Sequence, residues 1–265
     1  MLWARAIWRT YMQYEADKGY LVWCSEDYIM CAVTLAKSLR YWHPDVKICL
    51  LTNVDYTNPL FDYIKKFPYK NQGGWHDDWQ VYQASPFHET VKLEADMIVS
   101  GPIDHWWTHY RKSPVWISTG CRNQYNQVVD TRRYRKIFDK NKLPDTYNAI
   151  TYWRVSREAQ EFFRNVRICF ENWDDIKVHL QGGQDELAST DVIYGLNADD
   201  YVTPGYGPQI VHMKQSILGT NVKHWNNELI WEIDDGVLRI NGYNQAGLVH
   251  YYVKQLAEKF GECYD

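Results

Sequence analysis

Two acidic side chains lie one residue apart directly after an apolar segment: Glu94 and Asp96 in VKLEADMIV. The preceding residues 90–93 read as a buried strand, and in an open α/β sheet ligands bind beyond the carboxyl ends of the strands. Two carboxylates on one extended turn can reach one ligand together, and oxygen ligands favour Mg²⁺ or Mn²⁺. The segment therefore predicts a divalent metal site, and the alternative interpretation is a solvated strand end.

A cation held in this way suits a ligand with concentrated negative charge, such as a diphosphate. Two carboxylates alone would repel a diphosphate, whereas a divalent ion between them binds both partners. The ion would also stabilise the diphosphate as it leaves with its negative charge. We therefore expect Glu94 and Ala95 to contact a nucleotide as well.

The elements before this motif predict a parallel sheet. Residues 20–24 (YLVWC) and 46–51 (VKICLL) read as strands, and the residues between them have apolar side chains at helical spacing. A strand, a helix and a strand in this order form a βαβ unit with parallel strands. No GxGxxG or GxxxxGK[ST] pattern follows either strand, which argues against a dinucleotide or P-loop site.

The remaining patterns extend this α/β interpretation. Strands are expected at residues 115–118, 149–153 and 210–212, helices at 59–67, 79–87, 157–170, 185–194 and 248–260, a polar loop at 71–78, and a hairpin formed by 229–233 and 237–240. No Pro/Gly-rich linker divides the chain. We therefore expect residues 1–265 to form one domain, with residues 220–265 as a C-terminal annex.

Composition restricts the partners. The net charge of -4 gives no general attraction to nucleic acid or to an anionic membrane. No stretch has the roughly 18 apolar residues of a membrane span, and the first residues lack the apolar core of a signal peptide, so a cytoplasmic protein is expected. The 13 Trp and 21 Tyr fit sugar or base stacking as well as core packing.

The motif segment LEADMIVSGPIDHWW (residues 93–107) resembles the D-x-D segment of retaining GT-A glycosyltransferases of the glycogenin and bacterial galactosyltransferase type. Four further stretches resemble that family in the same order along the chain, and the resemblance covers about residues 20–220. They are residues 20–53, Tyr147-Asn148-Ala149 (family "FNAG"), Gly182 to Leu187 (family "DQ" helix start) and Val211 to Ser216 (family "HFxGxxKPW"). The resemblance implies a GT-A fold, a mostly parallel sheet with helices on both faces, and manganese-dependent transfer from a UDP-sugar with retention.

The chain departs from the family pattern at several positions. Glu94 replaces the first Asp, Ile150 replaces a Gly, Gln184-Asp185-Glu186 reorders the Asp-Gln pair, and no KPW follows Met213-Lys214. These differences concern the donor sugar more than the metal.

The resemblance also assigns roles to individual residues. His212 is expected as the third metal ligand, and His250 is interpreted as structural. Asp185 is the candidate catalytic residue on the donor sugar, as a nucleophile or as a stabiliser of an oxocarbenium-like transition state, although a helix N-cap explains it equally well. Asn148 is the second catalytic candidate, with a strand-entry Asn as the alternative.

Further residues are candidates for nucleotide binding. Ser25 and Asp27 follow the first strand, where a base and ribose would lie, and helix capping is the alternative. A loop with Trp75, Asp78 and Trp79 could close over the donor, or it could be an ordinary packed loop. Lys214 could hold the phosphates, or it could be a solvated lysine. The basic run Arg132, Arg133, Arg135 and Lys136 is interpreted as a solvated helix face, although it could contact a nucleic-acid acceptor.

The leading hypothesis is thus a hexosyltransferase whose acceptor is a glycan, a protein or a modified nucleic-acid hydroxyl. A non-catalytic sugar-binding protein on the same fold and a nucleotidyltransferase remain as alternatives. A nucleotidyltransferase usually needs a glycine- and basic-rich loop after the first strand, and the residues at that place, Cys24-Ser25-Glu26-Asp27, do not form one.

Overall fold

The strands predicted around the acidic motif lie side by side in the largest sheet of the computed structural model, whose order is β3-β2-β1-β4-β9-β6. The structure describes residues 14–69, 74–129, 136–182, 189–198, 210–212 and 230–265. β1, β2, β3 and β4 run parallel, β9 is antiparallel to β4, and β6 is antiparallel to β9. The bounds are β1 Ala16–Trp23, β2 Ile48–Leu51, β3 Tyr63–Lys65, β4 Phe87–Glu94, β6 Val115–Thr119 and β9 Thr146–Arg154. The predicted mostly parallel sheet is confirmed.

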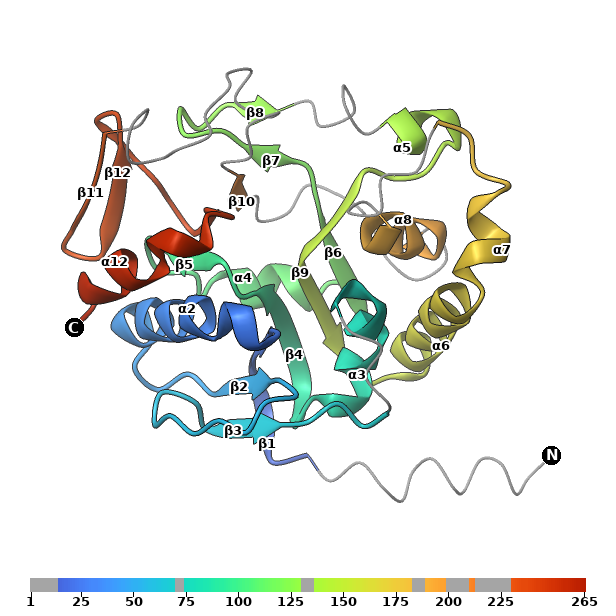
Figure 1. The fold of residues 1–265 in the computed structure, drawn as a ribbon, viewed down its shortest axis with the longest axis horizontal. Coiled ribbons are helices and arrows are strands. Elements are labelled where there is room, and N and C mark those ends of the chain that lie inside the picture. The colour runs from blue at the N-terminus through green and yellow to red at the C-terminus, as the bar shows by residue number, and fades with distance from the viewer. Residues whose placement is uncertain (1–13, 70–73, 130–135, 183–188, 199–209, 213–229) are drawn as a thin grey trace.

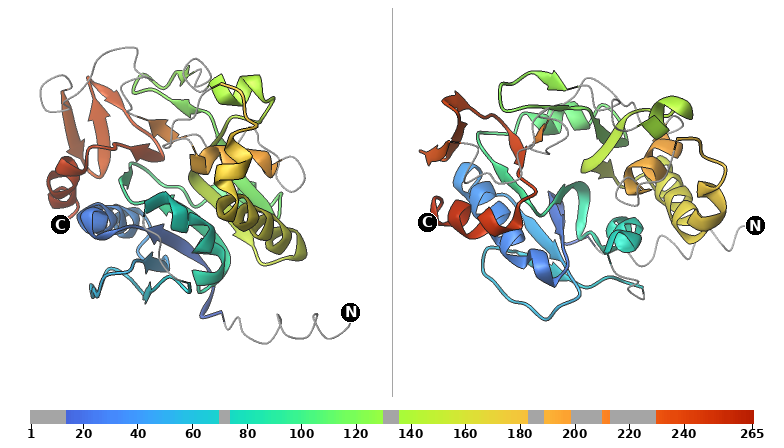
Figure 2. Two further views of the ribbon diagram at one scale, coloured as in Figure 1. Left: turned by 45° about the vertical axis from the view of Figure 1, so that its right-hand side comes forward. Right: turned by 45° about the horizontal axis from the view of Figure 1, so that its top comes forward.

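Helices cover both faces of this sheet, as Figure 1 shows, with α2 and α12 on one side and α3, α6 and α8 on the other. The helical elements are η2 (Glu26–Tyr28), α2 (Ile29–Trp42), η3 (Gly74–Gln80), α3 (Val81–Ala84), α4 (Trp106–Tyr110), α5 (Lys136–Lys140), α6 (Arg157–Glu171), α7 (Trp173–Lys177), α8 (Ser189–Leu196), η6 (Lys254–Leu256) and α12 (Ala257–Glu262). In both views of Figure 2 α12 stays beside α2, and the Thr34 hydroxyl donates to the Ala257 carbonyl at 2.6 Å.

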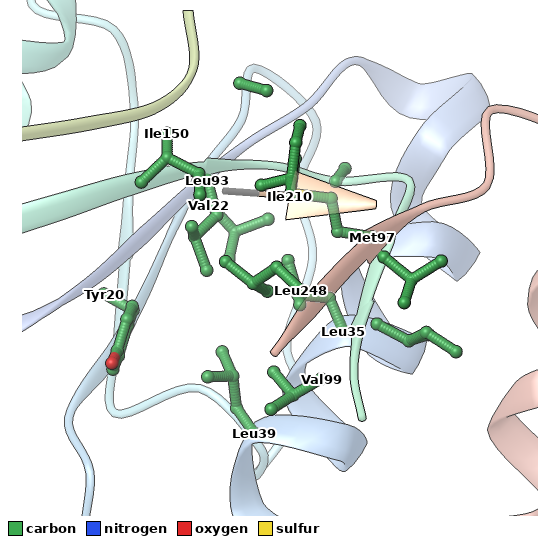
Figure 3. Packing of buried hydrophobic residues seen from close by; sticks show 14 of the residues in the cluster. Tyr20, Val22, Leu35, Leu39, Leu93, Met97, Val99, Ile150, Ile210 and Leu248 are labelled. Atoms are coloured by element: carbon green, nitrogen blue, oxygen red, sulfur yellow. The ribbon is translucent and has the colours of Figure 1, made fainter. Parts of the chain in front are cut away.

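The large sheet has one hydrophobic core on each face, because its side chains alternate between the two faces. Successive side chains of a strand point to opposite faces. On β1, Tyr20 and Val22 therefore pack into the core under α2, whereas Leu21 packs into the core under α3 and α6. Figure 3 shows the first core, in which Leu35 of α2 lies near Val99 and Leu248. The site described below lies at the edge of this core.

A second sheet has the order β5-β14-β10-β7-β8, and a third has the order β11-β12-β13. Their bounds are β5 Met97–Val99, β7 Cys121–Arg122, β8 Val128–Val129, β10 Ile210–His212, β11 Trp231–Asp234, β12 Val237–Ile240, β13 Tyr243–Asn244 and β14 Leu248–His250. The predicted C-terminal hairpin is β11–β12. Its turn has positive φ at Asp235 (50°) and Gly236 (74°), the pattern of a type I′ hairpin turn.

The helix predicted over residues 59–67 is wrong. Residues 63–65 form the edge strand β3 against β2, because Asp62 accepts a hydrogen bond from the Ile48 backbone N–H at 2.9 Å and fixes the register. This pairing partner lies outside the segment, so the local pattern did not contain it.

The helix predicted over residues 248–260 is correct only in its last part. Leu248–His250 is strand β14, which pairs antiparallel with β5 and parallel with β10. Gly247 precedes it with φ 72°, a conformation that breaks a helix. This correction matters because it places His250 at the end of a strand and not within a helix.

The helix predicted over residues 79–87 is shorter. Residues 74–80 form a 3₁₀ segment rather than a loop, α3 ends at Ala84, and Phe87 begins β4. Ser85 is extended (ψ 131°) because a residue that precedes a proline avoids the helical region. Among the described residues, no helix has the length and apolar character needed to cross a bilayer.

Candidate metal centre

The carboxyl ends of three parallel strands meet at one edge of the large sheet. Trp23 of β1 is the register partner of both Leu51 of β2 and Glu94 of β4. The residues that follow β1 and β4, among them Ser25 and Asp96, therefore leave the sheet at the same edge, as expected for a ligand site in an α/β fold.

Glu94, Asp96 and His250 form a cluster at this edge. Their ligand atoms lie within 4.8 Å of one another, and this is the one group of this kind in the described part of the chain. His250 Nε2 is 3.0 Å from Asp96 Oδ1, and His250 Nδ1 is 3.3 Å from Glu94 Oε2. Two carboxylates and one imidazole suit a divalent ion such as Mn²⁺, so the donor set fits the metal that the sequence predicted.

Strand pairing brings the histidine to the acidic motif. β14 is antiparallel to β5, and its register places His250 opposite Met97. The next residue, Tyr251, donates its backbone N–H to the Asp96 carbonyl at 3.1 Å. The turn after β4 and the end of β14 are thus held together by their backbones.

Electrostatics at the cluster favour a cation. Burial raises the pKa of the Glu94 carboxyl, His250 and Lys92 oppose this effect, and the charge of Asp96 adds to it. The Glu94 side chain keeps 36% of its surface exposed, so water weakens the effect of burial. A divalent ion between Glu94 and Asp96 would remove their mutual repulsion.

Tyr147 covers the other side of the histidine. Its hydroxyl hydrogen-bonds His250 Nδ1, and the two rings stack with centroids 6.0 Å apart and planes at 23°. Burial, followed by the charges of Glu94, Asp191 and Asp96, raises the pKa of the Tyr147 phenol well above its ordinary value. The hydroxyl therefore keeps its proton at neutral pH.

Asn148, predicted as catalytic, is buried and bonded within the protein through each of its polar groups. Its backbone N–H donates to Asp191 Oδ1 at 2.6 Å, and its side-chain amide donates to Asp78 Oδ2 at 2.9 Å. Its backbone carbonyl accepts from Lys92 Nζ at 3.1 Å, and its side-chain oxygen accepts from the Thr151 hydroxyl. These contacts give Asn148 a structural role, and a contact with a sugar stays a prediction.

Asp78, predicted to bind the nucleotide, belongs to the same buried network. Its Oδ1 is 2.8 Å from Lys92 Nζ, and its Oδ2 accepts from the Tyr194 hydroxyl at 2.7 Å. The neighbouring Trp79 is also buried, because Tyr69 packs on its ring at 5.2 Å and the Arg167 guanidinium lies 4.7 Å from the ring centroid. Nucleotide contact by either residue remains a prediction.

Ser25 and Asp27 are exposed beside the cluster. Ser25 occupies the N-cap position of η2 without a side-chain capping hydrogen bond, and Asp27 Oδ2 is 3.5 Å from Lys254 Nζ. Burial, followed by the charges of Asp96, Cys31, Asp27 and Glu94, raises the pKa of the neighbouring Tyr28 phenol. The structure thus brings these two residues near the acidic motif.

Other predicted residues lie outside the described part of the chain. This holds for Asp185, Lys214, the run from Arg132 to Arg135, and the side chains of Trp75 and His212. The backbone of His212 is described in β10, where it is the register partner of His250. Lys136 is exposed at the start of α5.

Three residues of the site were not singled out from the sequence. His250 was set aside as structural, and neither Tyr147 nor Lys92 received a role of its own. A lysine inside the apolar run TVKLE was a usable signal, because a buried lysine nearly always has a charged partner. No local signal connects Tyr147 with His250, since they are 103 residues apart.

Comparison of the sequence with protein-family models and with curated proteins finds no match. Comparison of the structure with solved structures does. The chain is similar to the galactosyltransferase LgtC, solved in complex with donor and acceptor sugar analogs, with a TM-score of 0.57 and 12% identity over 93% of this chain and 95% of LgtC.

Two larger glycosyltransferases are also similar. The bifunctional WbbM has a TM-score of 0.53 and 11% identity over 95% of this chain and 50% of its own, and GlyE from Streptococcus pneumoniae TIGR4 has 0.52 and 9% over 93% and 60%. At such identities the likeness concerns the fold. The chain therefore has the GT-A-type fold that the sequence predicted.

Proposed function

We propose that the protein is a metal-dependent glycosyltransferase that moves a hexose from a UDP-sugar to a hydroxyl acceptor, with retention at the anomeric carbon. One observation supports this most: Glu94, Asp96 and His250 converge at the carboxyl edge of the large sheet, in a chain whose fold is similar to that of a galactosyltransferase. In this proposal His250 supplies the nitrogen ligand that the sequence assigned to His212.

The cation would neutralise the diphosphate of the donor and stabilise it as it leaves. The residues of the chain would bind and orient the rest of the donor. The exposed Ser25 and Asp27 of the η2 region would face the base and ribose, and Lys214 would add a positive charge near the phosphates. Asp185 would stabilise the reacting sugar or attack it, and the acceptor hydroxyl would complete the transfer.

The C-terminal segment belongs to this site rather than to a separate unit. β14 contributes His250, and its backbone is tied to the acidic motif through Tyr251. This supports the proposal that residues 1–265 act as one domain in which the annex of residues 220–265 completes the metal centre.

The test is release of UDP from UDP-glucose and UDP-galactose by purified protein with Mn²⁺. We expect slow release that EDTA abolishes and that Asp96→Ala abolishes without loss of folding. Isothermal titration with UDP plus Mn²⁺ provides the second arm. Protein that binds glycans but shows no metal-dependent UDP binding would instead be a sugar-binding module, and the proposal would be wrong.

A further inference from the structure

The hydroxyl of Tyr147 distinguishes this chain from the segment it resembles. The related motif begins with Phe, whereas this chain has Tyr at the same place, and the additional oxygen hydrogen-bonds His250 Nδ1. We propose that Tyr147 is a positioning residue of the metal centre, which holds the His250 ring so that Nε2 is the nitrogen offered to the cation. The inference rests on the proposed metal-dependent function.

The backbone around Tyr147 is fixed on both sides. Its own carbonyl accepts a hydrogen bond from the Ser118 hydroxyl of β6. The next residue, Asn148, is held by hydrogen bonds with four residues from four elements: Asp191 of α8, Asp78 of η3, Lys92 of β4 and Thr151 of β9. A phenol on such a backbone has little freedom, so its hydroxyl is a fixed reference point for the histidine.

The two nitrogens of His250 have different surroundings. Nε2 is 3.0 Å from Asp96 Oδ1, and Nδ1 faces Glu94 Oε2 at 3.3 Å and the Tyr147 hydroxyl, which is closer. A 180° rotation of the ring about the Cβ–Cγ bond would put Cδ2 in the place of Nδ1 and Cε1 in the place of Nε2, and it would break the Tyr147 contact. The ring therefore keeps Nε2 beside Asp96.

The chemistry of a phenol suits this role. A histidine that binds a cation through one nitrogen carries its proton on the other and donates it to a nearby group. The oxygen of Tyr147 can accept that hydrogen bond from Nδ1, and it can donate to Nδ1 when that nitrogen carries no proton. The contact therefore persists in either tautomer, which a phenylalanine ring cannot achieve.

The experiment measures Mn²⁺ affinity of the full chain by titration calorimetry or electron paramagnetic resonance. Loss of an outer-shell partner typically weakens metal binding about 10–100-fold, so we expect at least about tenfold weaker binding for Tyr147→Phe. Tyr152→Phe is the matched control, because it removes a hydroxyl from the same strand that donates to Glu89 Oε2 at 3.0 Å, away from the cluster. Its Mn²⁺ affinity should equal that of the wild type.

A second readout needs no metal. The ¹⁵N resonances of the His250 ring, assigned with His250→Gln, should shift in Tyr147→Phe and stay unchanged in Tyr152→Phe. Wild-type Mn²⁺ affinity or an unshifted His250 ring in Tyr147→Phe would overturn the inference while leaving the proposed function intact. Absence of Mn²⁺ binding by the wild type would instead overturn the proposed function.

Discussion

Lys92 Nζ lies 2.8 Å from Asp78 Oδ1, and the two side chains are only 3% and 7% exposed. This ion pair joins η3 to β4 near the end of the strand, two residues before Glu94. Asn148 and Tyr194 supply hydrogen bonds to the same groups, so both charges are compensated inside the protein. The strand that presents the acidic motif is thus anchored by a buried charge network.

Removing one partner of this pair should be costly. We expect Lys92→Met to lower the free energy of unfolding by about 3–5 kcal/mol, because it leaves a buried carboxylate without its partner. The double variant Lys92→Met/Asp78→Asn should lose less than the sum of the single changes. Chemical denaturation of the wild type, Lys92→Met, Asp78→Asn and the double variant measures this coupling.

An exposed pair of equal length provides the control. Lys66 Nζ is also 2.8 Å from Asp55 Oδ1, but the two side chains are 48% and 103% exposed. Lys66→Met should leave the unfolding free energy nearly unchanged, since exposed pairs contribute little. Equal losses for Lys66→Met and Lys92→Met would refute the importance of burial.

His250 should be required for metal binding. We expect His250→Ala to weaken Mn²⁺ binding at least about tenfold, because it removes one of the three proposed ligands. The exposed His179 offers a control, and His179→Ala should bind Mn²⁺ as the wild type does. Titration of both variants decides the matter, and unchanged binding by His250→Ala would exclude this histidine as a ligand.

Asp62 should make stability depend on pH. Burial alone would raise the pKa of its carboxyl, but hydrogen bonds from Lys47, the Ile48 N–H and Arg40 outweigh burial and lower it. A carboxyl with a lowered folded-state pKa stabilises the fold above the pKa of the unfolded chain, about 4, and this contribution disappears as pH falls through the folded-state value.

Asp62→Asn should therefore cost about 1–3 kcal/mol at pH 7, since hydrogen bonds to a charged group are lost. The difference from the wild type should shrink as pH falls below about 4. Urea denaturation at a series of pH values measures it. Asp55→Asn, which alters a fully exposed carboxyl, should show little effect at any pH, and a constant gap for Asp62→Asn would contradict the linkage.

Gly247 and Gly242 both have positive φ, and Gly247 should tolerate substitution by alanine less well than Gly242. Its φ is 72°, and an added Cβ would lie 2.6 Å from Trp106 Cζ2, whereas Gly242 has φ 82° and open space around it. We expect Gly242→Ala to cost about 1–2 kcal/mol from backbone strain. Gly247→Ala should cost about 1–3 kcal/mol more from the clash.

Because Gly247 directly precedes β14, Gly247→Ala should also weaken Mn²⁺ binding by displacing His250. Thermal or chemical unfolding and metal titration of the two variants test these expectations. Equal stability losses for both alanine variants would show that the Trp106 ring can move away from the added Cβ without loss of stability.

Local sequence patterns were sufficient for the core of the sheet and for the acidic motif. The apolar runs at β1, β2 and β4 and the helical spacing of α2 predicted a parallel βαβ arrangement, which the structure confirms. Glu94 and Asp96 could be placed at the sheet edge because their position follows directly from the end of an apolar strand.

The rest of the site depended on contacts between distant segments. Leu248–His250 fits a helix as well as a strand by its own pattern, and only pairing with β5 and β10 selects the strand. That pairing puts His250 beside Asp96, and the backbone anchored at Asn148 puts Tyr147 beside His250. A short apolar run carries no information about its partner, so tertiary packing decided that His250 lies beside the two carboxylates.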